Sequence, residues 1–172
     1  MNRFKNLYIN RADGRFHNTE YLTQAMFLHL RWREFLDDDY AKCPEQSFYE
    51  YFVDTVERLS PFFWVVVKDG AAVGIVYLEN VTGSGKELYN SEITVCFDKS
   101  VWGGYTLETL KLFKRYYFEA LGFRKIKALV YPQNFRVKTL LKRIGFKQEG
   151  LLHAETLKNG KPQDIEVYAL AA

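Results

Sequence analysis

Two adjacent glycines, Gly103 and Gly104, stand where a strand-like segment gives way to an amphipathic, helix-like one. Because glycine has no Cβ, a ligand can approach this backbone closely. The first amides of the following helix have no partner inside it and lie at the positive end of its dipole, an arrangement that binds phosphate or pyrophosphate. The same pair also commonly separates two elements. Because the pair belongs neither to a Walker loop nor to a GxGxxG fingerprint, it does not identify a ligand by itself.

A second segment, YPQNFRVKTLLKRIGFKQEG at residues 131–150, has polar residues around a short helical pattern. Asn134 is suited to cap the start of a helix, and Gly145 is suited to end it in the left-handed conformation. Taken alone, the segment is a strand end, a capped helix and a glycine stop.

The spacing of apolar residues predicts the elements that position these two segments. Helices are expected over residues 20–36, 45–59, 104–121 and 135–144. Strands are expected over residues 62–68, 72–79, 91–97 and 125–131, with a weak strand at 6–10 and a closing hairpin about Asn159-Gly160. Strands mixed with two late helices predict an α+β fold with a mixed sheet.

The segment SEITVCF at residues 91–97 alternates along the predicted strand. Successive side chains of a strand point to opposite faces. One face therefore carries Glu92, Thr94 and Cys96, and the other carries Ile93, Val95 and Phe97.

Length and composition exclude several classes of protein. A chain of 172 residues with 48% hydrophobic and 26% charged residues is typical of one globular domain, which we expect to span residues 1–172. No apolar run is long enough for a membrane span, and the first residues lack the apolar core of a secretory signal. We therefore expect a cytoplasmic protein without a membrane partner.

The net charge and the residue types that bind metals bear on two further kinds of ligand, nucleic acids and metal ions. The net charge of +3 is too small to predict nucleic-acid binding. The three histidines are scattered, so no metal site is expected. Cys43 and Cys96 lie far apart and are most simply free thiols in a reducing compartment.

Taken together and in order, the motifs resemble one known family. The matching stretches are WGGYTLETL at 102–110, PQN at 132–134, IGFKQEG at 144–150, and then Asp164 and Tyr168 around the closing hairpin. They resemble the GNAT family of acetyl-CoA-dependent N-acetyltransferases, and within it the branch of the ribosomal-protein N-terminal acetyltransferases. The resemblance is clear over residues 62–170 and weak over residues 1–61.

The resemblance implies a GNAT-like mixed, mainly antiparallel twisted sheet flanked by helices. It implies direct transfer of an acetyl group from acetyl-CoA to a primary amine, which is a protein N-terminus or a small amine. The pantetheine arm is expected along the strand that ends at Phe97, paired with the backbone of Val95 and Phe97. The pyrophosphate is expected on the amides of Trp102, Gly103, Gly104, Tyr105 and Thr106. Asn134 is expected to hydrogen-bond the cofactor, with Lys138, Lys142 and Arg143 near its 3′-phosphate.

The chemistry of the implied reaction names further residues. An alkylammonium has a pKa near ~10, so the attacking amine must lose a proton to a base. Glu92 is the predicted base, because related enzymes often place a glutamate on this strand; the alternative is an exposed residue or an ion-pair partner. Tyr131 or Tyr89 is the predicted acid. The protein is expected to act as a monomer or homodimer.

This chain departs from the family pattern at two places. The glycine turn is one residue short, and Leu141 and Val137 stand where many relatives carry a tyrosine acid and a serine. A non-catalytic acyl-CoA-binding or interaction module on the same fold therefore stays open. The acidic run Asp37–Asp39 is read either as a rim that attracts a cationic substrate or as a solvated helix end.

Overall fold

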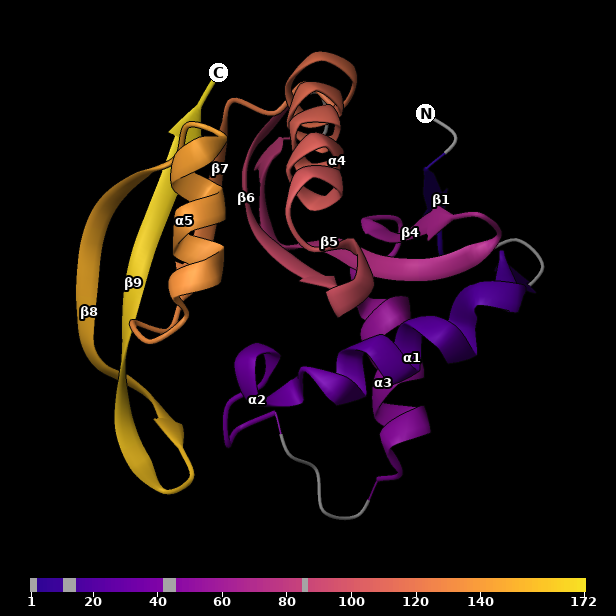
Figure 1. Ribbon diagram of the computed structural model, residues 1–172, viewed down its shortest axis with the longest axis horizontal. Coiled ribbons are helices and arrows are strands. Elements are labelled where there is room, and N and C mark those ends of the chain that lie inside the picture. The colour runs from indigo at the N-terminus through magenta and orange to yellow at the C-terminus, as the bar shows by residue number, and fades with distance from the viewer. Residues whose placement is uncertain (1–2, 11–14, 42–45, 85–86) are drawn as a thin grey trace.

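A computed structural model describes residues 3–10, 15–41, 46–84 and 87–172 (Figure 1). Its strands are β1 (Phe4–Asn6), β2 (Tyr8–Asn10), β3 (Arg15–His17), β4 (Phe63–Lys68), β5 (Ala71–Ser84), β6 (Glu87–Phe97), β7 (Lys125–Val130), β8 (Lys147–Lys158) and β9 (Lys161–Ala171). Its α-helices are α1 (Leu22–Arg31), α2 (Arg33–Leu36), α3 (Phe48–Leu59), α4 (Gly104–Arg115) and α5 (Phe135–Arg143).

Within these residues, seven strands form one sheet in the order β1-β4-β5-β6-β7-β9-β8, and β2 pairs with β3 alone. Neighbouring strands of the large sheet are antiparallel except β6 and β7, which are parallel. The predicted mixed, mainly antiparallel sheet flanked by helices is therefore confirmed.

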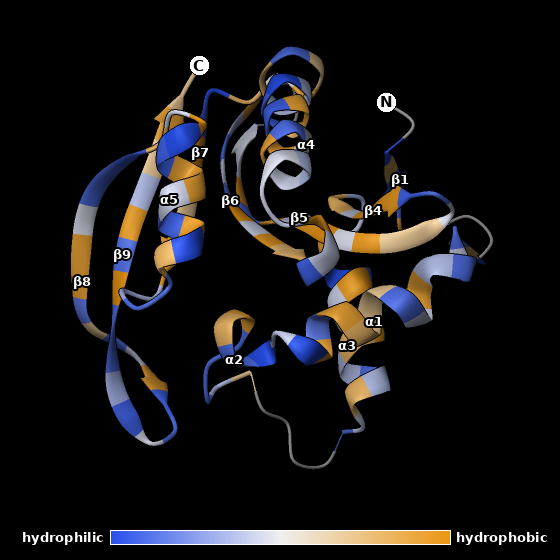
Figure 2. Cartoon of the chain, viewed as in Figure 1, coloured by the Kyte–Doolittle hydropathy of each residue, from blue (hydrophilic) through white to orange (hydrophobic). Residues whose placement is uncertain are grey.

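Helices cover both faces of the sheet, and each layer has its own apolar core. On one face, α1 and α3 pack with Phe52 and Phe63, and Cys96 of β6 points into this core. On the other face, α4 and α5 bury Phe113 and Leu141 against the sheet. Figure 2 shows apolar and polar residues alternating along α4 and α5, as expected for helices with one buried face.

The N-terminal helices differ from their predictions. Residues 20–36 form a 3-10 turn, Thr19–Tyr21, followed by α1 and α2, which are separated at Trp32. The prediction of one continuous helix is wrong, because Trp32 leaves the helical conformation at ψ 14° while its ring packs 5.2 Å from that of Trp102.

Helix α3 begins three residues later than predicted. Ser47 caps its start by accepting from the Glu50 amide at 3.2 Å, and the Glu50 carboxylate accepts from the Ser47 amide at 2.9 Å. This reciprocal capping box fixes the first turn. Glu45, where this helix was predicted to begin, lies outside the described residues, as do Pro44 and Cys43.

Two other elements differ in extent. The helix predicted over residues 104–121 is α4 followed by a π-helical turn, Tyr116–Ala120, and Gly122 ends it with φ +76°. The weak strand at 6–10 is two strands, because β1 pairs with β4 and β2 pairs with β3. Among the described residues, no helix is both long and apolar enough to cross a membrane.

Candidate active site

The parallel strands β6 and β7 pair for only three residues and then separate. Their pairs are Asn90↔Lys125, Ser91↔Ile126 and Glu92↔Lys127, although β6 continues to Phe97 and β7 to Val130. The strands therefore form a fork whose closed end lies at Glu92 and Lys127.

A cavity of about 850 Å³ occupies this fork. Six consecutive residues of β6, 92–97, the last three residues of β7, 128–130, and Tyr131 directly after it line this cavity. Because successive strand residues point to opposite faces, the cavity passes through the sheet and opens on both helix layers. It consequently offers two half-sites, one on the α4–α5 face and one on the α1–α3 face, that meet between the strands.

The first half-site contains the exposed start of α4. Gly103 has φ +98°, a conformation that favours glycine, and the Leu107 amide donates to the Gly103 carbonyl at 3.0 Å. The amides of Gly104, Tyr105 and Thr106 precede this bond, as expected for the unpaired first turn of a helix. A Cβ added at Gly103 or Gly104 would meet no atom within 4 Å. The backbone is therefore open to an anionic ligand despite the shortened turn.

The side chains of Tyr105 and Thr106 turn away from such a ligand. The charged ends of Arg3 and Lys68 lie 4.6 and 5.2 Å from the centre of the Tyr105 ring, and the Thr106 hydroxyl donates to the Val101 carbonyl at 2.8 Å. Gly103 and Thr106 line the cavity, whereas Gly104 and Tyr105 are not part of its lining. These two predicted contacts can therefore come only from their backbone amides.

Trp102 links the glycine turn to the end of β6. Its indole N–H donates to the Phe97 carbonyl at 3.0 Å, so the predicted backbone pairing at Phe97 shares that oxygen. The Arg136 guanidinium lies 4.1 Å from the centre of the Trp102 ring. Trp102, Val95 and Phe97 all line the cavity.

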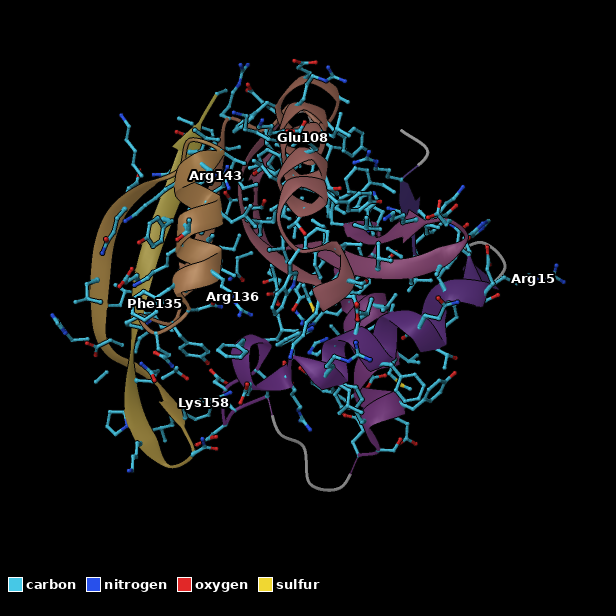
Figure 3. The ribbon with its side chains drawn as sticks, in the orientation of Figure 1. Arg15, Glu108, Phe135, Arg136, Arg143 and Lys158 are labelled. Carbon is cyan, nitrogen blue, oxygen red and sulfur yellow. The ribbon has the colours of Figure 1, made fainter. Side chains whose placement is uncertain are left out.

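Of the three basic residues predicted near this half-site, Arg143 lines the cavity, whereas Lys138 and Lys142 do not. Arg136 and Arg143 line the cavity, and Figure 3 shows them near the two ends of α5. Lys138 is instead held by Glu166 at 3.0 Å and by the Pro132 carbonyl. Sequence reasoning missed Arg136, although its separation of seven residues from Arg143 places both on one helix face.

Asn134 lines the cavity and caps α5. Its side-chain oxygen accepts from the Val137 amide at 3.3 Å, which leaves its amino group outside the cap. Leu141 and Val137 also line the cavity, and Leu141 is buried. The positions where many relatives carry an acid and its helper are thus occupied by apolar side chains.

Glu92 lines the cavity at the closed end of the fork, on the α1–α3 face. One carboxylate oxygen accepts from the Lys127 ammonium and the other from the Asn80 amide, each at 2.8 Å. The side chain is 16% exposed, so the carboxylate is partly buried but still accessible. The ion pair that the sequence left as an alternative is therefore present, and it holds the carboxylate in one orientation.

Tyr131 follows β7 at the open end of the fork and lines the same cavity. Burial, and then the charges of Asp38, Asp37 and Asp39, raise the pKa of Tyr131 to about 12. Its phenol is therefore protonated at neutral pH and can donate a proton. Tyr89, the alternative acid, is 58% exposed and is not part of the cavity lining.

Cys96 does not supply a nucleophile. Its thiol is buried against the Leu28 carbonyl at 3.6 Å, and burial raises its pKa far above the ordinary value. The described residues contain no group of three or more His, Cys, Asp or Glu side chains that could hold a metal ion.

Asp37 is a buried structural residue, so the solvated-helix-end reading is wrong for it. Its carboxylate accepts from His29 at 2.9 Å, from Arg33 at 2.9 Å and from the Tyr51 hydroxyl at 3.2 Å. Burial raises the pKa of Asp37, but the hydrogen bonds and charges of His29 and Arg33 outweigh it, so the pKa lies below its ordinary 3.8.

A carboxyl with a lowered pKa stabilises the fold above its ordinary pKa, and this stabilisation disappears as the pH falls below it. We expect the Tm of the protein to fall between about pH 5 and pH 3. We expect Asp37→Asn to lower the free energy of unfolding at pH 7 by about 1–3 kcal/mol, and therefore to lower the Tm. The Tm of this variant should also fall less steeply as the pH falls from about 5 to 3. Thermal melts across this pH range test the prediction; parallel curves for the two proteins would contradict it.

Comparisons with known proteins agree with this geometry. The chain matches the family model described as "Acetyltransferase (GNAT) domain" over residues 14–147. It is 36% identical over 67 residues to "Uncharacterized N-acetyltransferase YoaA" of Bacillus subtilis (strain 168), a match that spans 39% of this chain and only 38% of that relative.

Solved structures share the fold at low identity. The ribosomal-protein-S5-alanine acetyltransferase of Vibrio fischeri superposes with a TM-score of 0.69 at 19% identity, covering 91% of both chains. Mycobacterium smegmatis RimJ, in complex with CoA-disulfide, gives 0.72 at 20% identity over 91% of this chain and 79% of that one. A spermidine N-acetyltransferase chimera from Vibrio cholerae and hSSAT gives 0.69 at 22% identity, covering 98% and 95%. With the family match spanning most of its length, this chain belongs to the GNAT acetyltransferase family.

Proposed function

We propose that the chain transfers an acetyl group from acetyl-CoA directly to a primary amine. The observation that carries the proposal is the cavity that passes through the sheet at the fork. It lets a donor bound on the α4–α5 face meet an acceptor bound on the α1–α3 face. Two of the similar solved structures are a ribosomal-protein-S5-alanine acetyltransferase and a spermidine N-acetyltransferase chimera, and spermidine carries primary amines.

The residues around the first half-site fit an acyl-CoA. The open amides at the start of α4 would hold the pyrophosphate, and the cationic side chains of Arg136 and Arg143 would lie close to the phosphates. The Val95 backbone and the Asn134 amino group would position the pantetheine arm. When bound, acetyl-CoA supplies an activated acyl group on a thiol leaving group.

Glu92 and Tyr131 would carry out the two proton transfers of the reaction. The acceptor ammonium, with a pKa near ~10, would lose a proton to Glu92, directly or through a water. Each carboxylate oxygen has two lone pairs, so the bonds from Lys127 and Asn80 leave Glu92 able to accept another donor. Tyr131 would hold the proton that the departing thiolate takes up.

Titration calorimetry with acetyl-CoA tests the donor half of the proposal. We expect a dissociation constant at or below about 100 µM, within the range typical of enzyme substrates. No detectable binding at that concentration would refute it. The alternative, a non-catalytic acyl-CoA-binding module, is favoured by the ion pair on Glu92 and by Leu141; binding without turnover on a panel of amines would support it.

Tyr131→Phe is expected to lower kcat by about tenfold, since the CoA thiol, with a pKa of ~8.5 or above, leaves fairly well without an acid. The affinity for acetyl-CoA should stay unchanged. Because burial raises the pKa of Tyr131 to about 12, deprotonation of its phenol should not lower the wild-type rate between pH 8 and about 10. Steady-state kinetics over this range measure both effects, and an unaltered kcat would remove Tyr131 from the reaction.

A further inference from the structure

The cavity at the fork extends beyond the two half-sites, into the space between α4 and α5 (Figure 1). On α4 it is lined by Thr106, Leu110, Phe113 and Lys114, and their spacing places them on one face of the helix. With a rise of about 1.5 Å per residue, this lining follows α4 for about 12 Å. The amides proposed to hold the phosphates belong to the first turn alone. About 6 Å of the cavity, from Leu110 to Lys114, is therefore left for another part of a ligand.

Apolar side chains enclose this extension, which we call the apolar branch. They come from α4, from β7 and from the segment that leads from α5 into β8. Each is at most 7% exposed, and they are Leu110, Phe113, Ile126, Leu141, Ile144 and Phe146. Because these side chains line the cavity although solvent hardly reaches them, the branch is a pocket and not a surface groove. A closed pocket lined by Leu, Ile and Phe stays dry and binds apolar groups.

The two ends of the apolar branch differ. At the far end, the Lys114 ammonium donates to the Ile144 carbonyl at 3.1 Å and so joins the last turn of α4 to the end of α5. At the near end the branch opens on the fork, because Val95 and Val130 line the same cavity. A ligand that reaches the branch must therefore come from the fork, where the thioester of the donor is proposed to lie.

The side chains at the mouth of the branch are apolar where relatives are polar. Leu141 and Val137 stand at the positions that resemble those of a tyrosine acid and its serine helper. An acid that protonates the departing thiolate must lie within reach of its sulfur, so this part of α5 faces the thioester. In this chain it offers the thioester an apolar wall, and the acyl group on the sulfur begins beside the branch.

Given the proposed function, on which this inference rests, we propose that the apolar branch binds the acyl chain of the donor. The protein would then transfer straight-chain acyl groups longer than acetyl. With C–C bonds of about 1.5 Å, an extended chain advances about 1.3 Å per carbon, so about 6 Å holds about five carbons beyond the carbonyl. The expected donors are therefore acyl-CoA esters up to about hexanoyl.

The chemistry of transfer is the same for the longer chains. The amine nitrogen bonds to the acyl carbonyl carbon, and the carbon–sulfur bond breaks. Of the two protons that the acceptor ammonium loses, one leaves through Glu92 and the other balances the proton that the CoA thiolate takes up. The branch residues would act on the choice of donor and take no part in proton transfer.

A series of CoA esters tests this inference, with acetyl, butyryl, hexanoyl and decanoyl members and propylamine as the acceptor. Each buried methylene tightens binding by about threefold, so calorimetry should show hexanoyl-CoA binding at least about tenfold more tightly than acetyl-CoA. Decanoyl-CoA should gain nothing further, because the branch ends at Lys114. The kcat/KM for butyryl- and hexanoyl-CoA, measured as thiol release, should be at least that for acetyl-CoA.

Two variants should shift the chain-length profile in opposite directions. Leu110→Phe adds bulk inside the branch, so the gain in affinity should end at butyryl-CoA. Ile144→Ala removes bulk at the far end, so decanoyl-CoA should bind more tightly than it binds to wild type. The affinity for acetyl-CoA should change by less than about twofold in both variants. Because the shifts are opposite, loosening of the fold alone cannot produce both.

Matched controls make the same substitutions in the other core. Leu59 and Ile75 are buried on the α1–α3 side of the sheet and lie outside the cavity lining. Leu59→Phe and Ile75→Ala should therefore lower the Tm without changing the chain-length profile. Thermal melts of all four variants show whether the profiles are compared between folded proteins.

Three results would overturn the inference. Butyryl- and hexanoyl-CoA could bind no more tightly than acetyl-CoA and react at least about tenfold more slowly. Alternatively, the gain in affinity could continue through decanoyl-CoA and stay the same in Leu110→Phe, which would indicate apolar binding elsewhere. Both results leave transfer of the acetyl group standing. If the CoA esters bind but no amine is acylated by any of them, the proposed function itself fails, and the inference fails with it.

Discussion

Glu92→Gln should lower kcat by about 10²-fold or more while the affinity for acetyl-CoA stays nearly unchanged. The amide has almost the shape of the carboxylate and can still accept from Asn80, but it cannot take a proton from the acceptor amine. The expected loss therefore lies in the chemical step. Steady-state kinetics with saturating acetyl-CoA, together with calorimetry on the same variant, measure the two quantities separately.

Lys127→Met is the matched control, because Glu92 also forms an ion pair. This variant breaks the same 2.8 Å contact but leaves the carboxylate in place. If Glu92 acts as the base, Lys127→Met should lose much less activity than Glu92→Gln at a comparable change in Tm. Equal losses in the two variants, or an unaltered rate in Glu92→Gln, would mean that Glu92 is a structural partner only.

Gly104→Trp should abolish measurable acetyl-CoA binding and leave the fold intact. A side chain at this position begins in open space, since its Cβ meets no atom within 4 Å, and the backbone does not require a positive φ there. The indole would occupy the space above the first amides of α4, where the pyrophosphate is proposed to bind. Calorimetry should show an affinity loss of at least about 10²-fold, which equals about 2.8 kcal/mol.

Two variants control for this substitution. Gly104→Ala adds only the Cβ and should bind acetyl-CoA more tightly than Gly104→Trp. Gly150→Trp places the same bulk in equally open space on β8, outside the cavity lining, and should bind like wild type. Full acetyl-CoA affinity in Gly104→Trp would contradict the placement of the phosphates at this turn.

Local patterns predicted the elements that position the site. The alternation of residues 91–97 correctly placed Cys96 on the face opposite Ile93, Val95 and Phe97, and the structure shows that these two faces pack into different cores. Asn134 begins a helix and Gly122 ends one, as their residue types suggest. The break at Trp32 was missed, because it depends on a ring contact with Trp102, seventy positions along the chain.

The candidate site was predicted less completely than the fold. Glu92 and Tyr131 do line one cavity, but their catalytic roles stay predictions. The partners of Glu92 could not be predicted, since Lys127 reaches it only through parallel pairing of β6 with β7, and Asn80 reaches it from β5. The role of Asp37–Asp39 was likewise hidden, because their partners lie in the closing hairpin.

The rate of CoA thiol release, measured while acetyl-CoA and propylamine are varied together, tests the central claim most directly. Direct transfer at the fork predicts that thiol release requires both substrates and that the double-reciprocal lines intersect, as for a ternary complex. Thiol release that does not depend on the amine, parallel lines that indicate an acetylated protein, or bound acetyl-CoA without any release would contradict the account.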